Sequence, residues 1–308
     1  MPDTRLQEDV LLAEYSTFQL GGPCRILVEC PGEDSLISVV TALQGTPFIL
    51  IGGGSNILFS DAGYDGWIVR YCCSEPEIRR EGTLLEVSGA TSLDSLAGFA
   101  VKSGLGGLVN TSGIPGTVGG AVVGNAGAWG WQIGDAVKSV RLIDRNGVVH
   151  EARAEELQFA YRHSRLKQSD EIVLSVTLEL EEQNPSDLAK QRADILALRA
   201  GKHPDLDIQP CIGSIFKNIE PSSSAERRQA AGYFLEQAGV KQLKVGGAEV
   251  FARHANIIVK GEGCTSQQVH DLSLAMATAV RDQLGLELVR EVRFLGVFDG
   301  AGCNDGFF

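Results

Sequence analysis

The sequence has few of the features that mark zinc proteins, disulfide-rich proteins or membrane proteins. Its seven cysteines are odd in number and form no C-x-x-C pair, and its five histidines are scattered without metal-ligand spacing. Reduced thiols and no metal site are therefore expected. The first residues, MPDTRLQEDVLLAEY, have no signal-peptide pattern, and no apolar run approaches the ~20 residues of a membrane span. We expect a cytoplasmic protein with no membrane partner.

Clusters of basic residues are also missing. The formal net charge is −12 at pH 7, which argues against a nucleic-acid surface because such surfaces gather lysine and arginine. A small anionic ligand is compatible with this charge, since a few arginines, helix N-termini and backbone N–H groups bind one locally. We expect a small-molecule partner, no nucleic acid, and a monomer.

Apolar patterning predicts an α+β protein with more than one domain. The 308 residues suit two or three domains of ordinary size. The expected strands cover 25–30, 48–51, 66–71, 84–89 and a half-buried strand at 171–181, and the expected helices cover 33–43 and 91–104. Asn146-Gly147 predicts a two-residue hairpin turn. We predict three units, at 1–65, 66–183 and 184–308.

The composition of the chain changes in the third of these units. The segment NPSDLAKQRADILALRAG is expected to form a helix that opens at Ser186, closes at Gly201 and links two domains. A second helix is expected to start with the capping box of Ser223 and Glu226 and to end at Gly239. The last expected elements are a helix near 265–284 and a strand over 286–298.

Glycine, by contrast, is abundant, with 37 residues, and two stretches are especially rich in it. They read ILIGGGSNILFSD at 49–61 and GIPGTVGGAVVGNAG at 113–127. Successive glycines after a strand can turn their N–H groups toward a phosphate, and the missing Cβ lets the phosphate approach. The G-x-G-x-x-G pattern would need glycine at Ile57, and no G-x-x-x-x-G-K-[ST] motif occurs. Two such stretches favour a pyrophosphate-bearing cofactor outside the Rossmann class; tight turns in a crowded sheet are the alternative.

Six motifs in a fixed order connect these stretches with a known family. They are ILIGGGSNILFSD, GLVNTSGIPGTVGGAVVGNAGAWG, FAYRHSRLK, CIGSIFKN, GGAEVFARHANIIVK and LELVREVRFLG. Over 15–296 the chain resembles the UDP-N-acetylenolpyruvoylglucosamine reductases, flavoenzymes of peptidoglycan precursor synthesis. The resemblance implies the two-subdomain FAD-binding fold of the vanillyl-alcohol oxidase type, followed by a C-terminal α+β domain that binds the UDP-sugar. It also implies FAD and NADPH as cofactors.

The resemblance further implies that both glycine stretches line the pyrophosphate and isoalloxazine of FAD. Thr117 and Asn125 are expected to form hydrogen bonds with polar edges of the ligand. The cofactor-binding residues that the resemblance implies are Ile51, Gly52, Gly53, Gly54, Ser55, Asn56, Gly113, Ile114, Pro115, Gly116, Thr117, Gly119, Gly120, Ala121 and Asn125.

A reaction and three catalytic residues follow from the same resemblance. The family reduces UDP-N-acetylglucosamine enolpyruvate to UDP-N-acetylmuramate: NADPH reduces FAD, flavin N5 passes hydride to C3, and a proton reaches C2. By similarity, Ser214 is the proton donor, Arg162 holds the substrate carboxylate, and Glu291 polarises or protonates the intermediate. Judged from the residues alone, these are a turn serine, a surface arginine and a salt-bridged strand residue.

Other residues match positions on the substrate side of the family's site. Strand alternation places Arg293 on the same face as Glu291, where it would orient the intermediate. A point charge at Lys241 is expected to reach the diphosphate. The substrate-binding residues that the resemblance implies are Tyr161, Asn218, Lys241, His254 and Arg293. A packing role for the tyrosine and a satisfied buried histidine are the alternatives.

The chain departs from the family pattern at a few positions. Ile219 and Arg290 stand where proline is usual, and Gln19 stands where a basic residue is frequent. Only 51 residues (163–213) separate Arg162 from Ser214, which is too few for the tyrosine-bearing loop of one subclass. We therefore expect the shorter class, with a more open substrate cleft.

Three other functions are weighed against the reductase. A flavin oxidase of the same fold would not need the serine, arginine and glutamate together, and it would consume oxygen readily after reduction. A non-catalytic binding protein for FAD or a UDP-sugar would be expected to lack at least one of the three. An acidic scaffold without a ligand leaves the two glycine stretches unexplained.

Overall fold

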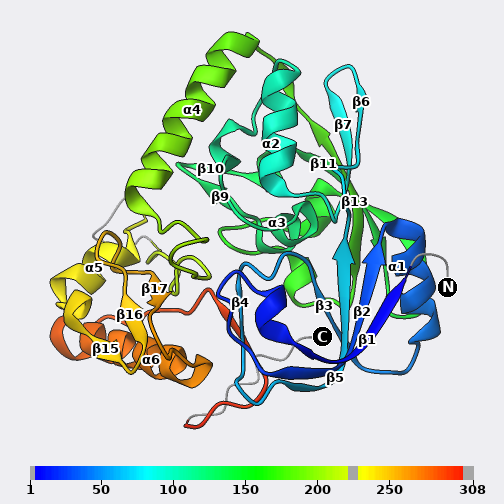
Figure 1. The fold of residues 1–308 in the computed structure, drawn as a ribbon. Helices are drawn as coiled ribbons and strands as arrows, with labels where there is room; N and C mark the ends of the chain where they lie inside the picture. The colour runs from blue at the N-terminus through cyan, green and yellow to red at the C-terminus, as the bar shows by residue number, and fades with distance from the viewer. Residues whose placement is uncertain (1–3, 221–227, 301–308) are drawn as a thin grey trace.

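A computed structural model describes residues 4–220 and 228–300 of the protein (Figure 1). The first unit is a four-stranded sheet in the order β1 (Arg5–Leu11), β2 (Pro23–Pro31), β5 (Tyr64–Cys72), β3 (Phe48–Ile51). The edge strand β1 runs antiparallel to β2, and the other pairs are parallel. The apolar stripe of α1 (Glu33–Ala42) packs on this sheet through Leu36, Val39 and Val40, as the helical spacing predicts.

The second unit is a five-stranded antiparallel sheet with helices on one face. Its order is β12 (Val149–Arg153), β11 (Val137–Ile143), β13 (Ile172–Glu179), β7 (Leu84–Ser88), β6 (Ile78–Glu81). Val173 and Val176 of β13 pack with the buried residues of α2 (Leu93–Lys102) and α3 (Val118–Gly124). Ile172 and Leu174 join the cluster that contains α1. The strand expected to be half-buried is therefore buried on both faces, because the first unit covers its second face.

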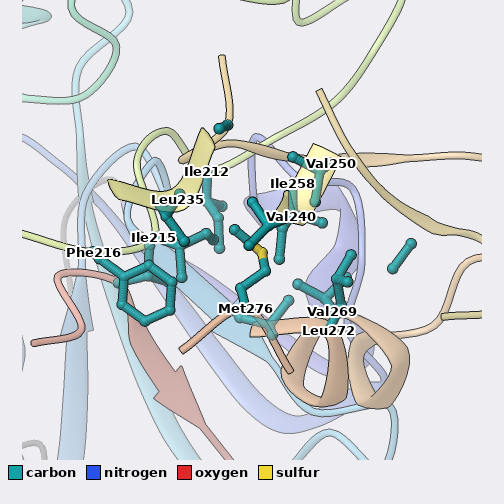
Figure 2. Close-up of a cluster of buried hydrophobic side chains, with 14 of the residues drawn as sticks. Ile212, Ile215, Phe216, Leu235, Val240, Val250, Ile258, Val269, Leu272 and Met276 are labelled. Carbon is teal, nitrogen blue, oxygen red and sulfur yellow. The ribbon is translucent and has the colours of Figure 1, made fainter. Parts of the chain in front are cut away.

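The third unit combines a small sheet with two helices around one apolar core (Figure 2). The sheet has the order β15 (Lys244–Val245), β16 (Ala248–Val250), β17 (Ile258–Lys260). Met276 of α6 (Ser266–Leu284) and Leu235 of α5 (Ala231–Gln237) are fully buried in this core. The chain then returns to the first unit, where β18 (Arg293–Leu295) pairs in parallel with β4 (Ile57–Phe59).

One expected domain boundary falls inside a strand, and the other separates a helix from the unit on which it packs. A boundary after residue 65 falls inside β5, whose pairing with β2 and β3 makes it part of the first sheet. The helix α4 (Pro185–Lys202) leads into the third unit but packs on the second (Figure 1). Arg192 of α4 donates hydrogen bonds to Asp94 of α2 at 2.9 Å and to Ser112 Oγ at 2.8 Å.

The helices begin at residues other than those expected. Asn184, rather than Ser186, caps α4, because Pro185 takes the first helical position, where its missing N–H costs nothing. The capping box expected at 223–226 lies outside the described residues, and α5 begins at Ala231. No helix within 4–220 and 228–300 combines the length and the apolarity that crossing a membrane requires.

The hairpin turn and the last strand also differ from expectation. Asp144 N–H bonds to Val148 O at 3.1 Å, and Gly147 alone adopts a positive φ, of 79°. The loop is therefore a three-residue turn with one left-handed residue, rather than the two-residue turn expected for Asn-Gly. Only Arg293–Leu295 of the strand expected over 286–298 is a strand.

The first unit supplies a cap for a helix of the third unit. The carboxylate of Asp61 accepts hydrogen bonds from the N–H groups of Ser266 at 2.8 Å and Gln267 at 2.9 Å, and Thr265 Oγ1 accepts from Gln268 N–H at 3.2 Å. Three N–H groups of the first turn of α6 are thus satisfied, and a negative charge lies at the positive end of the helix dipole.

We expect Asp61→Ala to lower the free energy of unfolding by about 1–2 kcal/mol, the usual cost of losing a helix cap. Urea unfolding followed by circular dichroism measures this difference. The matched control is Asp65→Ala, because Asp65 is an exposed residue whose one ion pair among the described residues, with Arg25, spans 3.7 Å; its effect should stay within about 0.5 kcal/mol. Equal effects for the two variants would contradict the capping role.

Candidate active site

The two glycine stretches lie against each other. A Cβ on Gly52 would lie 2.5 Å from Thr117 Oγ1, and a Cβ on Gly116 would lie 2.7 Å from Ser55 Oγ. Ser55 Oγ donates a hydrogen bond to Pro115 O at 3.1 Å. A side chain at either position would therefore press on a hydroxyl group of the opposite stretch, and glycine avoids this contact. Gly116 also has a φ of 118°, which disfavours any other residue.

Backbone N–H groups at this junction are available to a ligand. Among residues 4–220 and 228–300, none accepts a hydrogen bond from the N–H of Gly53, Ser55 or Gly116. Clustered N–H donors without partners form an anion-binding concavity. The first turn of α3 contributes less to it, because Thr117 Oγ1 already caps Gly120 N–H at 3.3 Å. Within the described residues, no group of three potential metal ligands occurs.

Several residues expected to touch the cofactor are instead buried behind these loops. Gly119 N–H donates to Gly89 O at 2.8 Å, which fastens α3 to the end of β7. Asn125 is fully buried, and its amide donates to Ala160 O at 2.8 Å and accepts from Gly134 N–H at 3.0 Å. Both ends of the Asn125 side-chain amide thus form hydrogen bonds within the protein. The buried members of the expected set are Ile51, Gly54, Gly119, Ala121 and Asn125.

Parallel pairing of β18 with β4 brings Glu291 to the first glycine loop. Arg293 N–H bonds to Asn56 O at 3.1 Å, and the Asn56 side-chain amide donates to Glu291 O at 3.3 Å. Glu291 therefore lies next to the loop that ends at Asn56, although 234 residues (57–290) separate the two in sequence.

The segment that carries Ser214 runs beside Glu291. Glu291 N–H donates to Ile215 O at 2.8 Å, and Lys217 N–H donates to Val289 O at 2.8 Å. On its other side, Ser214 forms a bridge with Ile257. Ser214 is partly exposed, while Ile215 beside it is fully buried, so the segment is anchored in the core and Ser214 is accessible.

Arg162 approaches Glu291 from the second unit. Its Nε lies 2.6 Å from Glu291 Oε1, and the two side chains form an ion pair. The buried Nε–H has no well-aligned hydrogen-bond acceptor among the described residues. Arg162 occupies a tight turn closed by two 3.0 Å bonds between Ala160 and His163, and its φ is +52°. A left-handed conformation costs about 1–2 kcal/mol in a residue other than glycine. Such strain is typical of functional sites.

Positive charge is concentrated around this ion pair. Lys167 Nζ donates to Arg162 O at 2.8 Å. Burial, together with the neighbouring charges of Lys217, Arg293 and Arg162, lowers the pKa of Lys167 to about 8, while Glu291 acts in the opposite direction. Three cationic side chains and one carboxylate thus act on the Lys167 ammonium group. This arrangement favours an anionic ligand.

Tyr161 and Asn218 bridge the second and third units. Asn218 N–H donates to Tyr161 OH at 3.1 Å, and Asn218 Oδ1 accepts from Ala231 N–H at the start of α5. Arg228 stacks over the Tyr161 ring at 3.5 Å and pairs with Glu220 at 3.1 Å. Burial raises the pKa of Tyr161. Asn218, expected to contact substrate, thus also caps a helix.

Lys241 and His254 have different surroundings. Lys241 pairs with Glu236 of α5 at 2.5 Å. The ring of His254 lies 5.5 Å from that of His203, and burial lowers the pKa of His254. In the part of the chain that the structure describes, neither residue forms a hydrogen bond or an ion pair with Arg162. The three residues expected to be catalytic therefore lie together, whereas Lys241 and His254 have other partners.

Comparison with known proteins identifies the family to which this arrangement belongs. A curated UDP-N-acetylenolpyruvoylglucosamine reductase from Heliobacterium modesticaldum is 37% identical over 297 residues, which cover 96% of this chain and 91% of the relative. The chain belongs to the UDP-N-acetylenolpyruvoylglucosamine reductase family. Another reductase of that name, from Chlamydia felis, is 36% identical over 94% of each chain. The model of the C-terminal domain of UDP-N-acetylenolpyruvoylglucosamine reductase matches residues 204–295.

The FAD-binding part of the reductase chain is matched separately. A family described as "FAD binding domain" matches residues 24–153, which contain both glycine stretches. A crystal structure of the reductase from Thermus caldophilus aligns with a TM-score of 0.79 at 29% identity, covering 95% of this chain and all of that one. The predicted family and fold class are confirmed, and the chain is an FAD-dependent oxidoreductase.

Sequence reasoning missed three cationic residues of the reductase site. Lys167 and Lys217 lie inside the motifs FAYRHSRLK and CIGSIFKN, whereas Arg228 lies outside all six motifs. A signal was available for the first two, because each is a basic residue within five positions of an expected catalytic group. No signal pointed to Arg228, since its contact with Tyr161 depends on tertiary packing.

Proposed function

We propose that this reductase converts the enolpyruvyl ether of UDP-N-acetylglucosamine into the lactyl ether of UDP-N-acetylmuramate, with NADPH as reductant. One observation carries the proposal: Ser214, Glu291 and Arg162, from distant parts of the sequence, gather beside the glycine loop that ends at Asn56. A polar, cationic cluster next to a cofactor cradle suits a substrate whose reacting carbon lies beside a carboxylate.

The cradle fits a flavin dinucleotide. Gly52, Gly53, Ser55, Gly116 and Thr117 would hold its pyrophosphate, because free N–H groups and missing Cβ atoms meet there. When bound, FAD supplies the hydride chemistry that no amino-acid side chain provides.

The side chains handle the charge and the proton. Hydride addition at C3 breaks the π bond of the alkene and leaves its electron pair on C2, delocalised into the neighbouring carboxylate. Arg162 binds that carboxylate and stabilises the developing charge, and its ion pair with Glu291 fixes its orientation. The Ser214 O–H bond then breaks as a C2–H bond forms, and water returns a proton to the serine oxygen.

The UDP part of the substrate extends toward the third unit in this proposal. Lys241 lies on the diphosphate side and must exchange its pairing with Glu236 for the ligand. His254, whose pKa is lowered by burial, is a neutral hydrogen-bonding group there. Asn218 and Tyr161 border the substrate near the catalytic trio.

Anaerobic turnover tests the proposed function. We expect NADPH oxidation by the purified holoenzyme to be slow alone and to be stimulated by at least ~10²-fold when the enolpyruvyl UDP-sugar is added, because only that alkene accepts the hydride. Absorbance of NADPH follows the reaction, and mass spectrometry identifies the product. In a parallel run in air, rapid oxidation of NADPH without the sugar would instead assign the chain to the flavin oxidases.

A further inference from the structure

Lys167 has no role in the reaction as described so far, yet it is held firmly at the site. It ends the short helix η5 (Arg165–Lys167), which is anchored by buried Leu166 and by a 2.8 Å hydrogen bond from Ser164 Oγ to Val123 O. From this platform the ammonium group reaches back to Arg162 O at 2.8 Å. A charged donor makes this a stronger bond than one between neutral groups.

The position of the Arg162 guanidinium depends on the turn at residues 160–163, and the bond from Lys167 holds a carbonyl of this turn. Arg162 is left-handed, a conformation that a residue other than glycine keeps only when its surroundings enforce it. The surroundings do so through the two 3.0 Å backbone bonds between Ala160 and His163 and through two side-chain contacts. Asn125 holds Ala160 O at 2.8 Å, and Lys167 holds the carbonyl of Arg162 itself. Without the bond from Lys167, the peptide after Arg162 keeps the bond from His163 N–H to Ala160 O, but its carbonyl end is no longer held.

The charges around Lys167 show which ligand it favours. Arg162 faces it from the turn, Lys217 from the segment after Ser214, and Glu291 and Arg293 from the approach to β18 and from β18 itself. An excess of positive charge in a partly buried cluster is compensated most directly by an anion bound among these groups.

We propose that Lys167 is a positioning residue: its ammonium group fixes the left-handed turn of Arg162 and so presents the guanidinium to the carboxylate of the enolpyruvyl substrate. This inference rests on the proposed function. It assigns Lys167 to substrate binding through Arg162, and not to contact with the reacting carbons.

The first test measures binding of UDP-N-acetylmuramate to the holoenzyme, by titration calorimetry, and the split between kcat and KM. Lys167→Met should weaken binding and raise KM by about 10- to 100-fold, as expected for a lost charged hydrogen bond. Lys167→Gln, which keeps a neutral donor, should recover part of this loss. The control Lys190→Met removes an exposed lysine of α4 and should behave as wild type.

The second test is a double-mutant cycle with Arg162→Met. If Lys167 acts through Arg162, the double variant should bind the ligand no more weakly than Arg162→Met alone. Losses that simply multiply would show an independent contact and overturn the positioning role.

The pH dependence gives a third, non-kinetic readout. Because the pKa of Lys167 is near 8, product affinity of the wild type should fall as pH rises through that value, and Lys167→Met should lack this fall. The stability of the ligand-free protein should change in the opposite direction. The unfolded chain stays protonated up to the ordinary lysine pKa, so the contribution of Lys167 to folding improves as pH rises through 8.

The outcomes separate the two proposals. If the wild type binds product and Lys167→Met binds it equally well at every pH, with normal thermal unfolding, the positioning role is wrong while the proposed function stands. If the wild type binds neither the enolpyruvyl sugar nor the product, the proposed function fails and the role of Lys167 fails with it.

Discussion

Replacing Ser214 with alanine should reduce turnover with the enolpyruvyl UDP-sugar by about 10³-fold. A positioned general acid contributes about 10²–10⁴-fold to a rate, and the Ser214 hydroxyl is the proposed source of the proton at C2. Ser214 is partly exposed, and its neighbours Ile215 and Phe216 anchor the segment in the core. Loss of one oxygen atom should therefore leave the fold intact. Reduction of the flavin by NADPH, measured in a single turnover without sugar, should stay within about twofold of wild type.

The role of Ser214 is identified by comparing the two half-reactions, because its loss should slow turnover and leave flavin reduction unchanged. A change that only disturbed the site would slow flavin reduction as well as turnover. Ser38→Ala is the matched control, because this partly exposed serine lies on α1 and its hydroxyl donates to Asp34 O within the same helix; both half-reactions should match wild type. Full turnover by Ser214→Ala would remove serine from the mechanism.

Alanine at Gly52 should release the flavin. Its Cβ would lie 2.5 Å from Thr117 Oγ1 and 3.1 Å from Thr117 Cγ2, so either Thr117 must turn away or the two glycine loops must separate. Overpacking of this kind costs about 1–3 kcal/mol, which corresponds to roughly 5- to 150-fold weaker cofactor binding if the cradle bears the whole cost. The ratio of flavin absorbance to protein absorbance after gel filtration measures retention of the cofactor.

Gly124→Ala provides a control from the same glycine-rich stretch. Gly124 is the last residue of α3, and no atom lies within 4 Å of the position its Cβ would take. Its flavin content should equal that of wild type, because neither the contact between the loops nor their free N–H groups change. Equal flavin content in Gly52→Ala would mean that the cofactor does not depend on this junction.

Periodicity predicted most elements of the first two units. The helices over 33–43 and 91–104 and the four short strands lie within a few residues of their predicted bounds, because local apolar spacing is satisfied by local packing. Burial of β13 on both faces was not predictable, since α1 of another unit covers its second face. The boundary predicted after residue 65 falls inside β5. Local apolar spacing does not reveal that β5 pairs with β2 on one side and with β3 on the other.

The candidate site was predicted as motifs and not as an arrangement. Ser214, Arg162 and Glu291 were singled out because their motifs resemble a family, but nothing local indicates that β18 pairs with β4 and brings Glu291 to Asn56. Within the glycine stretches, sequence could not separate residues that face the ligand from those that support the loop. Asn125 illustrates this limit, because its burial depends on Ala160 and Gly134.

One anaerobic mixing experiment tests the central claim that a flavin cradle made of two glycine loops opens onto the cluster of Ser214, Arg162 and Glu291. The holoenzyme is first reduced with one equivalent of NADPH and is then mixed with the enolpyruvyl UDP-sugar in the absence of oxygen. We predict that the absorbance of oxidised flavin returns at once and that UDP-N-acetylmuramate forms in equal amount. A flavin that stays reduced until oxygen is admitted would contradict the account.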